Sequence, residues 1–116
     1  MKMNIFYVGE KSLFEEFQQA TLNECIEYLL DKEVIGLDIE TTQKFGGQYR
    51  GEGLDPHLST IVMLQIGTLE RQYVIDVRCI DITPLKSILE DPSKVLVGHN
   101  IKFEYKHILN HNIKIN

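Results

Sequence analysis

Two acidic residues, Asp38 and Glu40, stand at the end of the apolar stretch VIGLDIETT, residues 34–42. Residues two apart in a strand point to the same face, so a strand here would bring both carboxylates together, above Gly36. Such a pair repels unless a cation lies between the two groups, and carboxylate oxygens suit Mg²⁺ or Mn²⁺. On this pattern alone a second interpretation stays open, in which the acids only begin a solvated loop.

A second candidate group lies in GHNIKFEYKHIL, residues 98–109, which predicts a helix with Asn100 at its N-cap. Glu104 lies at the edge of the apolar stripe of this helix and is a third acid that could lean toward the sheet. Phe103 lies off the stripe, so it either packs against another element or offers a platform for a base or sugar. The stripe itself is formed by Ile101, Tyr105, Ile108 and Leu109.

The elements that must position these residues follow from apolar periodicity and turn signals. Thr21 and Glu24 fit a capping box, which predicts a helix over about 21–31. The stretches 60–68 and 72–77 predict an antiparallel hairpin, and the glycine-rich stretch 41–59 predicts a long loop. Further strands are expected at 5–8, 34–40 and 95–97, and further helices at 83–91 and 101–109. The resulting order, β-α-β-β-β-α-β-α, indicates an α/β fold.

Composition narrows the class of protein. The 116 residues, 43% of them hydrophobic, are enough for one globular domain. The net charge of −5 argues against a protein that holds nucleic acid by bulk electrostatics. Cys25 and Cys79 have no metal-binding spacing and are expected to be reduced. With no signal peptide or membrane span in the sequence, we expect a cytoplasmic protein.

Two motifs, LDIETT and HNIKFEYK, occur in this order about sixty residues apart, with IVMLQIGT and YVIDV between them. Together they resemble the first two motifs of the DEDD-type 3′–5′ exonucleases, which have a ribonuclease H-like fold. The sequence is similar to the proofreading domain of family A, polymerase-I-type DNA polymerases, with ribonuclease D-like enzymes as close relatives. The resemblance runs from about Phe6 to the C-terminus.

The resemblance implies specific roles for the candidate residues. Asp38 would bridge two Mg²⁺ or Mn²⁺ ions, and Glu40 would bind the ion that carries the attacking water. Glu104 stands where the second motif has its acid, which usually ligates the second ion. One ion would activate the water and the other would stabilise the leaving 3′ oxygen. The residues implied to contact the 3′ end of the substrate are Thr41, Asn100 and Phe103.

Two departures from the family pattern affect these expectations. The family usually has Asp at the position of Glu104, and the extra methylene changes how the second ion would be held. The third motif, a Tyr or His followed four residues later by Asp, has no counterpart after Glu104. We therefore expect residues 1–116 to be the N-terminal portion of a single exonuclease domain, with a mixed sheet flanked by helices and truncated on its C-terminal side.

The expected function is that of a metal-dependent 3′–5′ exonuclease acting on single-stranded DNA ends, beside a polymerase domain in the same or a neighbouring chain. RNA remains a possible substrate, and the alternative is a noncatalytic exonuclease-like scaffold or nucleic-acid-binding module. The strand 95–97 would be an open sheet edge that favours self-association. The remaining polar candidates are expected to be surface residues: His57, His99, His107, His111, Lys102 and Lys106.

Overall fold

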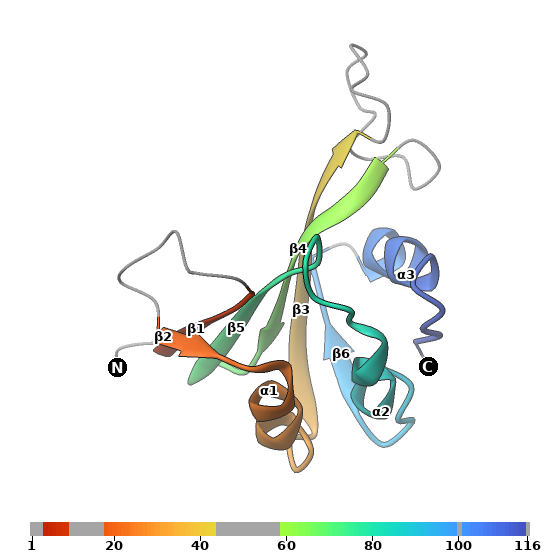
Figure 1. The fold of residues 1–116 in the computed structure, drawn as a ribbon. Coiled ribbons are helices and arrows are strands. Elements are labelled where there is room, and N and C mark those ends of the chain that lie inside the picture. The colour runs from red at the N-terminus through yellow and green to blue at the C-terminus, as the bar shows by residue number, and fades with distance from the viewer. Residues whose placement is uncertain (1–3, 10–17, 44–58, 100, 116) are drawn as a thin grey trace.

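The strand that carries Asp38 and Glu40 lies between two partners in a six-stranded mixed sheet with the order β2-β1-β5-β4-β3-β6 (Figure 1). The computed structural model describes residues 4–9, 18–43, 59–99 and 101–115. Pairing is antiparallel within β3–β4 and β4–β5, and parallel within β1–β2, β1–β5 and β3–β6. The strands are β1 Asn4–Val8, β2 Gln18–Ala20, β3 Val34–Gln43, β4 Ser59–Gly67, β5 Arg71–Asp76 and β6 Val95–Val97.

The predicted helices are present, and Thr21 is confirmed as the N-cap of the first. Thr21 caps α1, and its Oγ1 accepts a hydrogen bond of 3.1 Å from the backbone N–H of Glu24. The helix predicted at 83–91 is shorter and begins as a 3₁₀ turn. Within the described ranges, no helix is long and apolar enough to cross a membrane. The elements are α1 Leu22–Leu29, the 3₁₀ helix η2 Thr83–Leu85, α2 Lys86–Leu89 and α3 Ile101–Leu109.

The strands differ from the predicted ones by one additional strand and by the bounds of others. The short strand β2 was not predicted, and it adds a parallel neighbour to β1. The strand predicted at 34–40 continues to Gln43, and β4 begins at Ser59, so the predicted loop is shorter at both ends. The rest of that loop, residues 44–58, and the predicted N-cap Asn100 lie outside the described residues.

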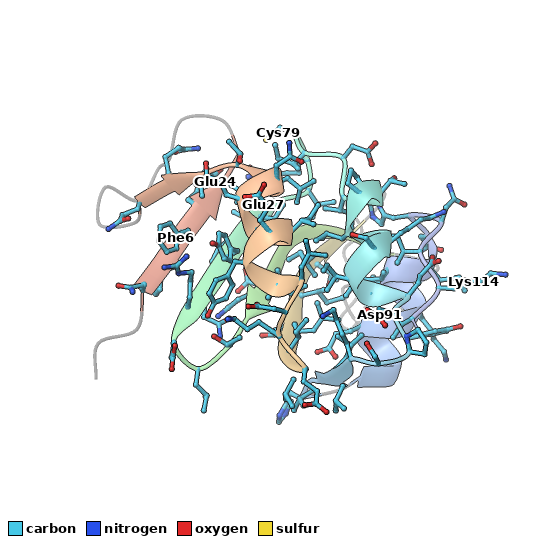
Figure 2. All side chains as sticks on the ribbon, turned by 90° about the horizontal axis from the view of Figure 1, so that it is seen from below. Phe6, Glu24, Glu27, Cys79, Asp91 and Lys114 are labelled. Atoms are coloured by element: carbon cyan, nitrogen blue, oxygen red, sulfur yellow. The ribbon has the colours of Figure 1, made fainter. Side chains whose placement is uncertain are left out.

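The hydrophobic core lies on one face of the sheet. Along β3 the buried residues are Ile35, Leu37 and Ile39, which alternate with exposed or half-buried ones as the two-residue period of a strand requires. Figure 2 shows the three helices on one side of the sheet. The helix residues that complete this core include Cys25, Leu29, Ile88, Leu89 and Ile108.

The opposite face, which we call the open face, carries the alternate residues of the strands. Strand pairing sets them in rows, because residues directly opposite each other share a face. The apolar side chains of Val34, Val95 and Val97 on this face are 56%, 53% and 52% exposed. No helix of the described ranges packs here. The rows are Gly36–Gly67–Gln72, Asp38–Gln65–Val74 and Glu40–Met63–Asp76.

The helix α3 is rotated relative to the predicted orientation. Leu109, predicted in the buried stripe, is 40% exposed, whereas Glu104 and His107 are each 1% exposed. The buried face is therefore formed by residues 104, 107 and 108, which lie three and four apart and share one side of a helix. The prediction that His107 is a surface residue is wrong, and Glu104 does turn toward the sheet.

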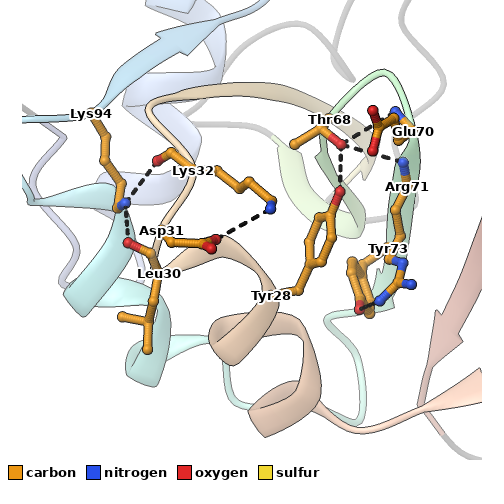
Figure 3. A network of polar contacts seen from close by, with 9 residues as sticks. All are labelled: Tyr28, Leu30, Asp31, Lys32, Thr68, Glu70, Arg71, Tyr73 and Lys94. Atoms are coloured by element: carbon orange, nitrogen blue, oxygen red, sulfur yellow. Dashed lines mark hydrogen bonds and ion pairs between the residues drawn. The ribbon is translucent and has the colours of Figure 1, made fainter.

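The edge strand β6 is tied to the end of α1 by a buried lysine (Figure 3). Lys94 is 9% exposed, and its Nζ donates hydrogen bonds of 2.7 Å to the Leu30 carbonyl and 2.8 Å to the Lys32 carbonyl. The last carbonyls of a helix lack partners within the helix, so the ammonium group satisfies that of Leu30, the C-cap of α1, and complements the helix dipole. This contact fixes the start of β6 and hence the position of the residues that follow it.

We predict that Lys94→Met lowers the free energy of unfolding by about 2 kcal/mol, because two charge-assisted hydrogen bonds are lost. Urea denaturation of both proteins measures the change. The matched control is Lys114→Met, which removes an exposed lysine and is expected to change stability by less than about 0.5 kcal/mol. Equal stabilities of the two variants would contradict the assigned role of Lys94.

Candidate functional site

The two carboxylates of the first motif lie on the open face of β3. Asp38 is opposite Gln65 and Glu40 is opposite Met63, and both acids are exposed. Asp38 Oδ1 accepts a hydrogen bond of 3.0 Å from the backbone N–H of Ile39, which holds the carboxylate near its own strand. The predicted pairing of Asp38 and Glu40 on one face, with Leu37 and Ile39 on the other, is confirmed.

The pairing of β3 with β4 changes register directly after Glu40. Glu40 pairs with Met63, but Thr41 pairs with Ile61, so β4 has an extra residue at this point. Such a bulge bends the strand and re-aims the side chains beside it. Thr41, the half-buried residue predicted to contact a substrate, therefore follows the carboxylates at a break in the ladder.

A hollow of about 290 Å³ lies beside Asp38 on this face. Gly36, which has no side chain, and the exposed His99 both line it. The hollow leaves space next to the carboxylate that a ligand group could occupy. Its lining residues are Gly36, Leu37, Asp38, Gln65, Gln72, Val97, Gly98 and His99.

The third acid reaches the same part of the sheet from α3. The carboxylate of Glu104 lies so close to Gly98 that a Cβ on Gly98 would overlap with it. The same Cβ would be 2.9 Å from the Leu37 carbonyl oxygen. Glu104 thus lies where β6 ends, beside the main chain of β3 one residue before Asp38.

The chemistry of these donors fits a hard divalent cation, because carboxylate oxygens are the usual ligands of Mg²⁺ and Mn²⁺. Within the described ranges, however, no group of three or more His, Cys, Asp or Glu side chains is placed to hold one ion. The convergence of Asp38, Glu40 and Glu104 on a common site stays a prediction. Asn100 and His57 lie outside the described residues, as do the side chains of Phe103 and Lys102.

A further polar cluster on the open face was missed by sequence reasoning. Asp76, at the end of β5, lies in the same row as Glu40 and is 7% exposed. The Arg78 side chain donates to it twice, from Nε to Oδ1 at 2.9 Å and from a terminal nitrogen to Oδ2 at 3.0 Å. The backbone N–H of Arg78 donates to Oδ1 at 3.0 Å, and the Tyr7 hydroxyl donates to Oδ2 at 3.3 Å.

These contacts change the acidity of the cluster. The side-chain hydrogen bonds from Arg78 hold the pKa of Asp76 below its usual value, despite the opposing effect of burial. Burial, followed by the nearby charge of Asp76, raises the pKa of Tyr7. Asp76 therefore stays ionised near neutral pH and keeps the guanidinium of Arg78 in place. The signal available in the sequence was the spacing Asp-x-Arg at the end of a strand.

Comparison with known families gives one match that covers most of the chain. A family model described as 3′–5′ exonuclease matches residues 16–116. No curated protein matches the chain.

Solved structures with a similar fold include one EXO domain and two RNase D proteins. The EXO domain of Nibbler from Aedes aegypti aligns with 100% of this chain at 16% identity and a TM-score of 0.64. RNase D from Escherichia coli, described as an exoribonuclease involved in structured RNA processing, aligns with 95% at 22% identity and a TM-score of 0.63. RNase D from Trypanosoma brucei in complex with RNA U12 aligns with 97% at 17% identity and a TM-score of 0.68. The chain spans only 51%, 24% and 36% of these three chains, respectively.

We predict that Gly98→Ala lowers the free energy of unfolding by about 2 kcal/mol, because the new methyl group overlaps with Glu104 and with a backbone oxygen. Gly36→Ala is the matched control. The nearest atom to its Cβ, the Gly67 carbonyl oxygen, is 3.6 Å away, so we expect a change below about 1 kcal/mol. Urea denaturation measures both variants. A Gly98→Ala protein as stable as Gly36→Ala would show that Glu104 does not lie against β6.

We also predict that Arg78→Gln makes the protein less sensitive to acid. Arg78 holds the pKa of Asp76 below its value of about 3.9 in the unfolded chain. The stabilisation that the ion pair gives is therefore complete above that pH and is lost as the pH falls through the pKa of the folded state. Unfolding midpoints measured between about pH 5 and pH 2 should therefore fall less steeply in Arg78→Gln than in the unchanged protein. Lys114→Gln should keep the original slope; if Arg78→Gln keeps it too, the ion pair contributes nothing.

Proposed function

We propose, from the premise that this chain belongs to the 3′–5′ exonuclease family, that the complete protein removes nucleotides from the 3′ ends of single-stranded DNA by metal-dependent hydrolysis. The observation that carries the proposal is the pairing of Asp38 and Glu40 on the open face of β3, inside the matched region. An exposed pair of carboxylates beside a hollow can bind cations and admit a phosphodiester at the same time.

The residues that would hold the metal are Asp38 and Glu40, with Glu104 as the ligand from α3. Bound Mg²⁺ or Mn²⁺ would lower the pKa of a water molecule and stabilise the charge on the leaving 3′ oxygen. The hydrogen bond from the Ile39 N–H keeps the Asp38 carboxylate oriented before any ligand arrives. Thr41, Asn100 and Phe103 are proposed to contact the terminal nucleotide.

The other parts of a working enzyme are proposed to come from outside this stretch. Because the chain spans a quarter to about half of the three similar structures, we propose that residues 1–116 are the N-terminal portion of one exonuclease domain. A third motif elsewhere in the protein would then supply the general base and the last metal ligand. A polymerase domain in the same or a neighbouring chain is the proposed partner, which would make the activity a proofreading one in DNA replication.

RNA is the second candidate substrate. The observation that favours it is the similarity of fold to two RNase D structures, one described as an exoribonuclease and one solved with RNA. The two candidates share the 3′ end and the phosphodiester chemistry, and they differ in the 2′ hydroxyl, through which proteins distinguish RNA from DNA.

We also propose where the protein is located in the cell and how it self-associates. A cytoplasmic location is supported by Cys25, which is buried, and Cys79, which is exposed, since neither forms a disulfide. Self-association is proposed at β6, which ends the sheet and exposes Val95 and Val97. An open strand edge offers unpaired backbone groups to a second strand.

The test uses labelled single-stranded DNA and RNA oligonucleotides with Mn²⁺. We predict stepwise digestion from the 3′ end by the complete protein, with a loss of at least about a hundredfold in Asp38→Ala. Residues 1–116 alone should show almost no turnover. The matched control is Glu27→Ala, which removes an exposed carboxylate on α1 and should leave the rate unchanged (Figure 2).

Three results would overturn this proposal. Digestion that survives in Asp38→Ala would mean that another site acts. A complete protein that binds the oligonucleotides without cutting them would favour the noncatalytic module. Digestion from the 5′ end would exclude the family activity.

A further inference from the structure

We propose that the guanidinium of Arg78 binds a backbone phosphate of the nucleic-acid strand that reaches Asp38 and Glu40, with Asp76 and Tyr7 as its positioning residues. The inference deepens the proposed function and rests on it.

Arg78 lies at the same edge of the sheet as the candidate site. The strands β3 and β5 both pair antiparallel with β4, so they run parallel to each other and end at the same edge. The register places Glu40, Met63 and Asp76 in one row on the open face. Asp76 is thus two strand spacings from Glu40, or about 10 Å along the row. A strand that crosses the open face can contact both positions.

The guanidinium is held in place before any ligand binds. Two side-chain hydrogen bonds, of 2.9 and 3.0 Å, join it to both oxygens of Asp76. The Asp76 side chain is only 10% exposed, whereas the Arg78 side chain is 59% exposed. Because a guanidinium has five N–H donors in a planar fork, three remain for another acceptor. In the part of the chain that the structure describes, no hydrogen bond joins these three to another residue. A preorganised fork of this kind suits a phosphate, which it can contact with two hydrogen bonds.

Charge gives the second reason. The protein has a net charge of −5, and the candidate site itself is acidic, so a polyanionic strand needs a local cation. Two other cations, Lys32 and Arg71, lie over the Tyr28 ring (Figure 3). Lys32 comes just before β3 and Arg71 begins β5, so both lie at the opposite edge of the sheet from Arg78. Lys94 is buried, and its ammonium group donates to the carbonyls of Leu30 and Lys32 just after α1. Of these four cations, Arg78 is therefore the one that lies at the edge of the sheet where β3 and β5 end.

A purely structural role is the competing explanation, because Asp76 also closes the turn after β5. That turn uses the backbone N–H of Arg78, which donates to Asp76 Oδ1 at 3.0 Å. This bond does not need the arginine side chain. The variant Arg78→Gln therefore removes the guanidinium and leaves the turn bond available, so binding and folding are separable in the experiment.

The binding experiment uses the complete protein and a fluorescent single-stranded oligonucleotide, without divalent metal, over a series of salt concentrations. We expect Arg78→Gln to raise Kd about tenfold at low salt. The slope of log K against log salt should become shallower by about 0.7, the value for one phosphate contact on a single strand. The matched control, Lys114→Gln, loses the same charge at a distant position and should behave as the unchanged protein. Figure 2 shows Lys114 well apart from Cys79, the neighbour of Arg78.

A third variant separates the fork from the charge. Arg78→Lys keeps a cation without the planar fork, so it should keep most of the salt slope while raising Kd about threefold. In digestion assays we expect Arg78→Gln to raise KM about tenfold and to change kcat less than twofold. A protein in which Arg78→Gln matches Lys114→Gln in Kd and in slope would overturn the proposal. So would equal losses of binding in both Arg78 variants, accompanied by lowered unfolding midpoints.

Failure of this inference is distinguishable from failure of the proposed function. The function fails if digestion does not depend on Asp38, whatever Arg78 does. The inference fails if Arg78 variants bind and digest normally in a protein whose digestion does depend on Asp38. The binding experiment needs no catalysis, so it tests Arg78 even in a protein that cuts nothing.

Discussion

The rest of the structure depends on the two-residue period of β3, which is paired on both sides. Its odd-numbered residues, Ile35, Leu37 and Ile39, enter the core, and its even-numbered acids must then face away from it. A slip of one residue would bury both carboxylates, which is costly without partners. The hydrophobic effect that fixes the register of β3 is therefore also what presents Asp38 and Glu40 on the open face.

The strand β6 in turn determines the position of the third acid, Glu104. Lys94 ties the start of this short strand to the end of α1, and the strand ends at Gly98, where only a hydrogen atom separates the backbone from Glu104. The position of Glu104 thus depends on a lysine ten residues earlier and on a missing side chain. Asp76 lies in the same row as Glu40, and its hydrogen bonds with Arg78 and Tyr7 fix the end of β5 in a comparable way.

Local signals account for the parts of the fold that the sequence predicts. The capping box at Thr21, the alternation of β3 and the hairpin of β4 and β5 each involve neighbours in the chain. The rotation of α3 was missed because its buried face includes Glu104 and His107, which hydropathy assigns to solvent. The strand β2, with the sequence QQA, carries no apolar pattern of its own and forms because β1 offers it an edge. The Asp76 cluster depends on Tyr7, 69 residues away, which no local pattern shows.

The strand order also has a consequence for how the chain folds. The pairs β3–β4 and β4–β5 join successive strands, whereas β1 must find β5 across more than sixty residues, as the pairing of Asn4 with Arg71 shows. Loop closure over such distances is entropically expensive and slows folding. The antiparallel meander is therefore expected to form first, and β1, which is synthesised before β5, can join it only once β5 is in place.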